Sequence, residues 1–146
     1  MITKNSIRIT DAEWEVMRVV WAHGTITSKE IIQVLEKKMN WKAATIKTLI
    51  GRLVEKEMLN TVQDGRRFIY SAAVEEEESI QTYTSDVLAR VCNKEAGQVI
   101  GHMLKKATFS HEDIKFLEEI LQQKKTEAVD EVKCECVAGQ CECQLH

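Results

Sequence analysis

The strongest chemical signal in the chain is a cluster of thiols near its C-terminus. Four of the five cysteines, Cys134, Cys136, Cys141 and Cys143, lie in the segment CECVAGQCEC at the spacing C-x-C-x4-C-x-C. Thiolates favour soft or borderline ions such as Cu+ and Zn2+. The link between the two cysteine pairs contains Gly139, which can adopt a positive φ and help fold the pairs back on each other. The spacing therefore predicts a thiolate metal site, although it does not distinguish copper from zinc.

Disulfide formation is the alternative use of these thiols. The chain begins MITKNSIRITDAEWEV, without the apolar segment of an export signal. No run approaches the roughly 18 apolar residues that a membrane span needs. We therefore expect a cytoplasmic protein without a membrane partner, where thiols stay reduced and clustered cysteines more often bind metal. His146 is a further potential ligand, although a terminal histidine is more often solvated.

The remaining reactive side chains do not suggest catalysis. Cys92 lies in an apolar stretch that predicts a helix, and we interpret it as a small buried hydrophobe that takes no part in the metal site. No Ser/His/Asp or paired-carboxylate arrangement stands out in the sequence. The sequence therefore predicts that the protein is not an enzyme.

Charge divides the chain into two halves. Residues 1–70 carry 12 Lys and Arg against 8 Asp and Glu, a net of +4, whereas residues 71–146 carry 8 against 15, a net of −7. Such an asymmetry is expected when only the first half meets a polyanion. We predict a DNA-binding domain over 1–74, a helical dimerisation domain over 75–130 and a metal-binding tail over 131–146.

Helix signals fill the first half. The motifs TDAE, from Thr10, and TSKE, from Thr27, both fit the capping box that opens a helix. Gly24 marks the end of the first helix. Asn40 is predicted to cap a third helix, WKAATIKTLIGRLVEKEM. Asp64-Gly65 then separates two short alternating stretches, which indicates a tight β-hairpin.

Three helices followed by a hairpin is the order of a winged helix-turn-helix, so the fold is predicted to be mainly α. Three further helices are expected, over about 76–92, 94–107 and 111–127. Their apolar stripes are too extensive for an open arrangement, so we expect them to pack on a second copy of the chain in a homodimer.

The third helix is the candidate reader of DNA. A helical wheel places Ile46, Leu49 and Ile50 on a core face and Gly51 among small or polar residues on the opposite face. A smooth outer face that tolerates a helical glycine suits a helix in a major groove. The predicted DNA-binding residues are Trp41, Lys42, Ala44, Thr45, Lys47, Thr48 and Arg52 around this helix, with Arg66 and Arg67 in the wing. Trp41 is expected to pack against the preceding helix with only its polar tip available.

Three segments carry a resemblance to a known family. The segments ITDAEWEVMRVVW, WKAATIKTLIGRLVEKEML and GRRFIYSA resemble those of the penicillinase-repressor (BlaI/MecI/CopY) family, and the thiol tail is similar to that of its copper-responsive branch. The resemblance implies a homodimer on a palindromic operator of double-stranded DNA. It also implies that the zinc-loaded form represses, and that Cu+, delivered by a copper chaperone, displaces the zinc and derepresses copper-homeostasis genes.

Three alternatives remain open at this point. A structural zinc clamp would tighten the dimer without responding to copper. A β-lactam-type repressor would be inactivated by proteolysis, although no cleavage signal is evident around KKATFSHED. A metal buffer would bind metal without an operator, and the third helix and wing argue against it.

Overall fold

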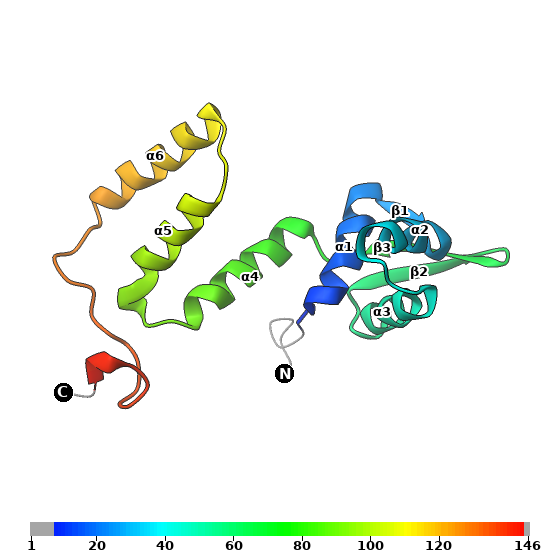
Figure 1. Ribbon diagram of the computed structural model, residues 1–146, viewed down its shortest axis with the longest axis horizontal. Helices are drawn as coiled ribbons and strands as arrows, with labels where there is room; N and C mark the ends of the chain where they lie inside the picture. The colour runs from blue at the N-terminus through cyan, green and yellow to red at the C-terminus, as the bar shows by residue number, and fades with distance from the viewer. Residues whose placement is uncertain (1–7, 145–146) are drawn as a thin grey trace. The chain divides into compact units, whose positions relative to one another are not determined.

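The computed structural model describes residues 8–144, and the chain divides within α4 into a winged unit, residues 1–82, and a helical unit, residues 83–146. The winged unit contains α1 (Asp11–His23), β1 (Thr25–Thr27), α2 (Ser28–Met39), α3 (Ala43–Glu55), β2 (Leu59–Asp64), β3 (Arg67–Ala72) and the start of α4 (Glu76–Ala89) (Figure 1). The rest of α4, η2 (Asn93–Glu95), α5 (Ala96–Lys106), α6 (His111–Lys125) and η3 (Glu142–Gln144) form the helical unit. Within the described residues, no helix has the length and apolar character needed to cross a membrane.

The predicted start and end of α1 are confirmed. The Thr10 hydroxyl accepts a hydrogen bond from the Glu13 amide at 3.2 Å, and the Thr10 amide donates to Glu13 Oε1 at 3.0 Å. This reciprocal pair satisfies two backbone donors that the helix itself leaves free. Gly24 ends the helix with a φ of 80°, where an L side chain would be strained.

The predicted role of Asn40 is wrong. Asn40 ends α2 in the left-handed conformation, with a φ of 56°, and its amide donates to the Glu36 carbonyl at 3.1 Å. Asparagine tolerates this region better than most residues because its short polar side chain can bond locally. The third helix begins at Ala43, and Lys42 precedes it without a side-chain cap. Both roles use an Asn between two helices, so the residue type alone could not separate them.

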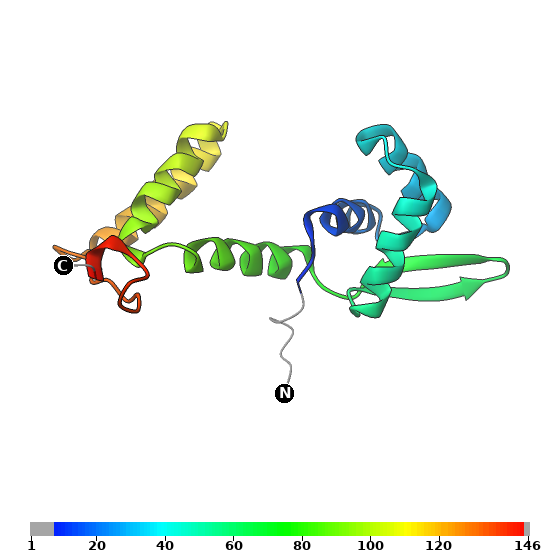
Figure 2. The same cartoon turned by 60° about the horizontal axis from the view of Figure 1, so that its bottom comes forward.

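A three-stranded antiparallel sheet in the order β1-β3-β2 forms the wing. Asp64 pairs with Arg67, which leaves the two-residue turn that the sequence predicts, and Gly65 takes a φ of 66° there. The hairpin extends beyond the helices of the winged unit (Figure 2). Strand β1, whose Ile26 pairs with Tyr70, was not predicted from the sequence. Three residues are too few for an alternating pattern to identify a strand.

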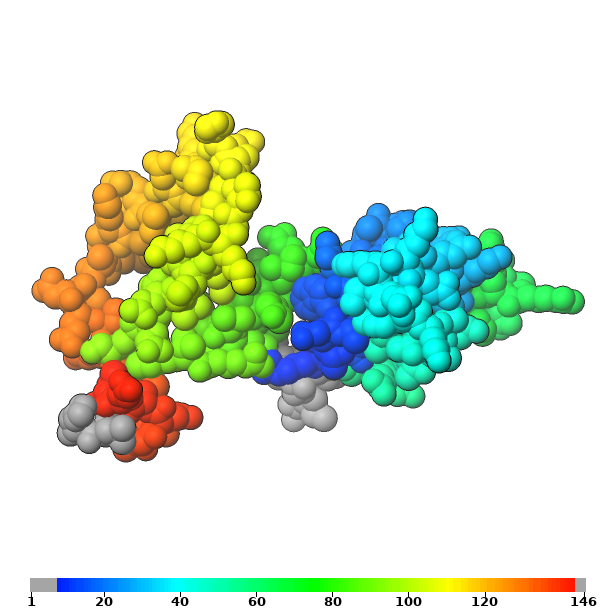
Figure 3. Space-filling model, viewed as in Figure 1, coloured from blue at the N-terminus to red at the C-terminus, as the bar shows by residue number. Residues whose placement is uncertain are grey.

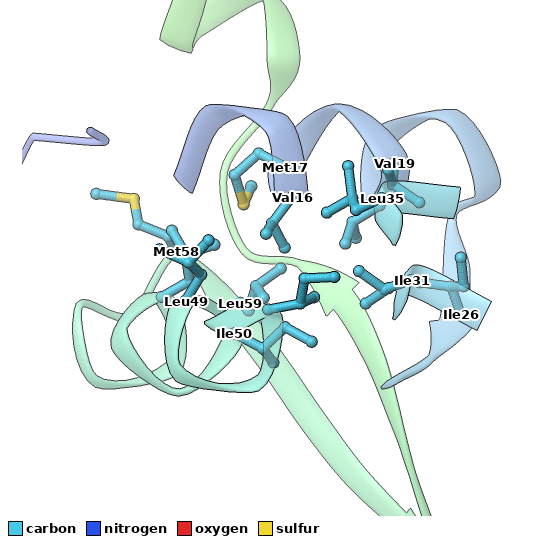
Figure 4. Packing of buried hydrophobic residues seen from close by; sticks show 13 residues of the cluster. Val16, Met17, Val19, Ile26, Ile31, Leu35, Leu49, Ile50, Met58 and Leu59 are labelled. Atoms are coloured by element: carbon cyan, nitrogen blue, oxygen red, sulfur yellow. The ribbon is translucent and has the colours of Figure 1, made fainter. Parts of the chain in front are cut away.

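One apolar core holds the winged unit together. It contains Val16, Met17, Val19, Val20, Ile26, Ile31, Leu35, Ile46, Leu49, Ile50, Leu53, Met58 and Leu59, all buried (Figure 4). Trp21 packs on the edge of this core, and its indole Nε1 donates to the Val74 carbonyl at 3.0 Å. This bond fixes the strand-to-α4 connection against α1. The winged helix-turn-helix prediction is confirmed.

A buried carboxylate connects α1 to the end of α3. Glu13 is only 1% exposed, and Lys56 Nζ lies 2.6 Å from its Oε1. Burial alone would raise the pKa of Glu13, but the hydrogen bonds from Lys56 and Thr10 and the charge of Lys56 lower it below 4.5. Glu13 Oε2 is buried and has no hydrogen-bond partner among the described residues. The Lys56 ammonium therefore stabilises the ionised form in the fold.

The helical unit has little interior of its own. None of its described residues with an assigned exposure is buried. Helix α6 begins after Ser110, whose hydroxyl accepts from the Asp113 amide at 3.0 Å. Helix α4 ends at Ala89, three residues before the predicted end, so Cys92 lies in the joint between α4 and α5. The interpretation of Cys92 as a helical residue is therefore wrong.

We expect Glu13→Gln to destabilise the protein by about 1–3 kcal/mol near neutral pH, because it removes a charged partner from Lys56. The pKa of Glu13 is lowered in the fold, so its stabilising contribution is present above 4.5 and is lost as pH falls through the folded value. Urea unfolding of both proteins should therefore give a smaller difference at about pH 3 than at about pH 7.

Glu15→Gln is the matched control, because Glu15 pairs with an exposed lysine, Lys38, on the surface. Surface pairs contribute at most about 1 kcal/mol. An equal loss in the two variants, or a Glu13→Gln effect independent of pH, would contradict this account.

Candidate metal centre and nucleic-acid interface

Helix α3 separates a buried face from an exposed one, as predicted. Its core face holds Ile46, Leu49, Ile50 and Leu53, and its outer face exposes Ala44, Thr45, Lys47, Thr48, Gly51 and Arg52. A Cβ built at Gly51 would meet no atom within 4 Å, so packing inside the protein does not require glycine there. The Thr48 hydroxyl donates to the Ala44 carbonyl at 3.0 Å. The outer face is therefore smooth enough to approach a nucleic acid closely.

The residues before α3 have separate roles. Trp41 is partly buried and packs against the core, which agrees with the expected packing role. Lys42 is exposed and supplies no side-chain hydrogen bond to the helix start. A lysine side chain has no hydrogen-bond acceptor, so Lys42 cannot cap the first amides of α3, and such a helix start favours an anion.

The two wing arginines differ in their surroundings. Arg67 Nη2 lies 3.4 Å from Asp64 Oδ2, and both side chains are exposed. Arg66 lies in the turn itself and has no ion-pair partner among the described residues. Arg66 is therefore the wing residue whose charge is fully available to a phosphate.

The tail, residues 134–143, folds back on itself as the spacing predicts. The Gln140 amide donates to the Val137 carbonyl at 3.1 Å, and Gly139 takes a φ of 89°. This turn brings Cys134 Sγ to 3.2 Å from Cys141 Sγ. The two C-x-C pairs therefore meet, although seven residues separate these two cysteines.

A cysteine from outside the tail completes the group. Cys92 Sγ lies 3.6 Å from Cys134 Sγ, and the sulfurs of Cys92, Cys134, Cys136 and Cys141 all lie within 4.8 Å of one another. We call these four residues the sulfur cluster. The sequence places Cys92 in a predicted helix, so it was interpreted as a small buried hydrophobe and not as a ligand. Cys92 and Cys134 lie 42 positions apart, and no local spacing connects them.

The donor set fits a thiolate-binding ion. Four sulfurs around a tetrahedral zinc, with bonds of about 2.3 Å, stand roughly 3.8 Å apart. The spacings within the sulfur cluster are close to this value. A hydrogen bond with Cys141, and then burial, raise the pKa of Cys136 to about 12. The Cys136 thiol is thus protonated near neutral pH in the metal-free protein, and a bound ion must replace its proton.

Cys143 has a different position. The residue is exposed and is not a member of the sulfur cluster. Loss of solvent around its thiol, and then a hydrogen bond with Cys141, raise the pKa of Cys143 to about 11. Cys143 therefore lies at the solvent side of the cluster, in contact with it. His146 lies outside the described residues.

The chain matches the family described as "Penicillinase repressor" over residues 9–123. It belongs to the penicillinase-repressor family. The members of this family are DNA-binding transcriptional repressors and not enzymes, so the predictions of a repressor and of no enzyme activity are confirmed. The match ends before residue 134, so the tail lies outside the part that defines the family.

Individual relatives agree with this assignment. An uncharacterised 16.5 kDa protein from the ptsI 3′ region of Latilactobacillus sakei is 39% identical over 143 residues, 98% of each chain. The penicillinase repressor of Bacillus licheniformis is 35% identical over 118 residues, 81% of this chain and 92% of that one. The solution structure of monomeric BlaI from Bacillus licheniformis with the blaP half-operator is 41% identical, with a TM-score of 0.44, and it covers 49% of this chain and 87% of that one.

We expect Arg52→Ala and Arg66→Ala to weaken DNA binding in different ways. If α3 enters the major groove, Arg52 can reach base edges, and a good bidentate base contact is worth about 1–3 kcal/mol of discrimination. In that arrangement Arg66 in the wing meets phosphate, which carries no direct sequence information. Arg52→Ala should lower the preference for operator over random DNA, whereas Arg66→Ala should weaken both equally. Equilibrium titrations on both DNAs at two salt concentrations measure this, and an equal loss on both DNAs by both variants would reject the placement of α3.

Proposed function

We propose that this repressor is a metal-responsive homodimer that controls copper-homeostasis genes in the cytoplasm. Its zinc-loaded form binds a palindromic operator, and Cu+ displaces Zn2+ from the tail and releases the DNA. The proposal assigns DNA binding to residues 1–74, dimerisation to 75–130 and metal binding to 131–146. The observation that carries it is the convergence of four sulfurs on a chain of the penicillinase-repressor family.

The DNA-binding half of the proposal rests on α3 and the wing. The outer face of α3 offers Thr45, Lys47 and Arg52 at exposed positions, and Arg66 lies at the tip of the hairpin. A recognition helix in the major groove with a neighbouring hairpin on the backbone uses both surfaces together. The Bacillus licheniformis relative, whose monomer was solved with a half-operator, supports the same use here.

The homodimer rests on the helical unit. Exposed large apolar side chains lie along α4, α5 and α6: Ile80, Tyr83, Leu88, Ile100, Met103, Leu104, Ile114, Phe116, Ile120 and Leu121. A surface with this many apolar side chains is unfavourable in water, and a second copy presents the same surface to cover it. Two α3 helices related by a twofold axis then face two half-sites about one helical turn apart.

The metal response rests on the chemistry of thiolates. Zinc favours four tetrahedral ligands, whereas Cu+ is softer and accepts fewer sulfurs per ion, so the same thiols can bridge more than one copper. Exchange then changes the shape of the tail while the ligands Cys134, Cys136, Cys141 and Cys143 stay the same. Moving the protein from mostly bound to mostly free takes about 5 kcal/mol of differential affinity between the two states. A copper chaperone that donates Cu+ directly is the partner expected for this exchange.

We expect full-length protein to protect two symmetric half-sites on one face of the operator, separated by about 34–36 Å. A fragment of residues 1–74 should protect the same bases only at much higher concentration, because it lacks the apolar helices that join the copies. Hydroxyl-radical footprinting, with the mass of the free protein from light scattering, measures both. A single asymmetric half-site for the full-length protein would contradict the homodimer.

We expect the double variant Cys141→Ser, Cys143→Ser to fold and dimerise but to stay on the operator when Cu+ is added. Both substitutions lie outside α4, α5 and α6, so the dimer surface is unchanged. Fluorescence anisotropy of labelled operator, with released zinc measured in the same sample, follows the response. If copper releases this variant as readily as the parent, the tail is not the sensor. If copper fails to release the parent protein, a structural zinc clamp explains the tail better.

A further inference from the structure

Polar contacts among the described residues join the tail to the joint between α4 and α5. The Asn93 side chain bonds to the backbone on both sides of Cys134: its Nδ2 donates to the Lys133 carbonyl, and its Oδ1 accepts from the Glu135 amide at 3.0 Å. Lys94 Nζ lies 3.2 Å from Glu131 Oε1. Figure 3 shows the red tail against this joint. Three contacts therefore align the tail with the residues that follow α4.

Cys92 is held where these contacts place the tail sulfurs. It precedes η2 with a φ of −57° and a ψ of 135°, and its carbonyl accepts from the Glu95 amide at 2.8 Å. Its sulfur lies 3.6 Å from Cys134 Sγ. Asn93, the next residue, fixes the backbone of Cys134 from both sides. The Asn93 hydrogen bonds therefore hold the Cys134 sulfur next to the Cys92 sulfur.

We propose that Cys92 is a metal ligand supplied by the helical unit, so that the bound ion ties the tail to the α4–α5 joint. This inference rests on the proposed function and changes its zinc ligand set to the sulfur cluster, Cys92, Cys134, Cys136 and Cys141, with Cys143 at the solvent side of the site. It also connects metal binding to the winged unit, because α4 begins in that unit and ends three residues before Cys92.

Packing does not explain the position of Cys92. A cysteine that acts as a small hydrophobe contacts apolar side chains in a core. No described residue of α4 or α5 is buried. The Cys92 sulfur lies 3.9 Å from Asn93 Oδ1 and within 4.8 Å of the sulfurs of Cys134, Cys136 and Cys141. The sulfur therefore faces polar groups and other thiols, which is the environment of a ligand.

A ligand from the helical unit changes what metal exchange can do. A tail that binds metal with its own four cysteines only could change shape without moving any helix. With Cys92 as a ligand, the ion joins the end of α4 to the tail across 42 residues of sequence. A change from tetrahedral zinc to copper with fewer sulfurs per ion then alters the restraint on the α4–α5 joint.

The test compares full-length Cys92→Ser with Val91→Ser, which perturbs the neighbouring joint position without removing a thiol. Each protein is loaded with Zn2+ alone and studied by zinc X-ray absorption and by competition with a chromophoric chelator. We expect Cys92→Ser to lose one of four sulfur ligands and at least about tenfold in zinc affinity, as second-sphere changes alone cost 10–100-fold. Val91→Ser should keep four sulfurs. Four sulfurs and an affinity within about twofold of the parent in Cys92→Ser would overturn the inference.

A second measurement uses the unmodified protein and does not depend on the folding of a variant. Zinc should protect Cys92 from alkylation by N-ethylmaleimide, read by peptide mapping, and slow hydrogen exchange at residues 90–95. Unprotected Cys92 beside protected tail cysteines would overturn the inference and leave the proposed function intact. Failure of the proposed function looks different, because the parent protein would then bind zinc yet stay on the operator with copper.

Discussion

The absence of an interior in the helical unit is the constraint on which the rest of the structure depends. The winged unit closes its own core around α1, α2, α3 and the sheet. Among the described residues, α4, α5 and α6 bury none of their apolar side chains. Hydrophobic burial is the dominant favourable contribution to folding, so these helices need a surface that the single chain does not supply.

The same constraint explains why the tail is fixed by polar contacts. A segment without an apolar core beneath it cannot be positioned by packing. Asn93 and Lys94 position it instead, through backbone and charge contacts on both sides of Cys134. The pair between Lys94 and Glu131 is exposed, and its hydrogen bond raises the pKa of Lys94. Such contacts orient a ligand well but contribute little stability, which leaves the arrangement responsive to a bound ion.

Local sequence patterns predicted most helices and the hairpin turn. Strand β1 and the role of Cys92 depend on long-range contacts, and local patterns did not predict them. The capping box located the start of α1 at Thr10, and Asp64-Gly65 located the hairpin turn, because each signal lies within four residues. The two faces of α3 followed from its 3.6-residue period. Strand β1 was missed because it exists through its pairing with β3, and Cys92 was misjudged because its neighbour lies 42 residues away. The predicted role of Asn40 was wrong for another reason, because asparagine occurs at either end of a helix.

The outer face of α3 has a further consequence for the kind of DNA that it can distinguish. Ala44 and Gly51 offer no hydrogen-bonding side chain, and the Thr48 hydroxyl is already donated to the Ala44 carbonyl. In the proposed docking, the centre of the helix would present methyl groups and bare backbone to the groove floor. In the major groove, the C5-methyl of thymine separates a T·A pair from a C·G pair by shape. The proposed docking therefore implies apolar contacts with thymine methyls at the centre of α3 and hydrogen bonds to bases at its ends.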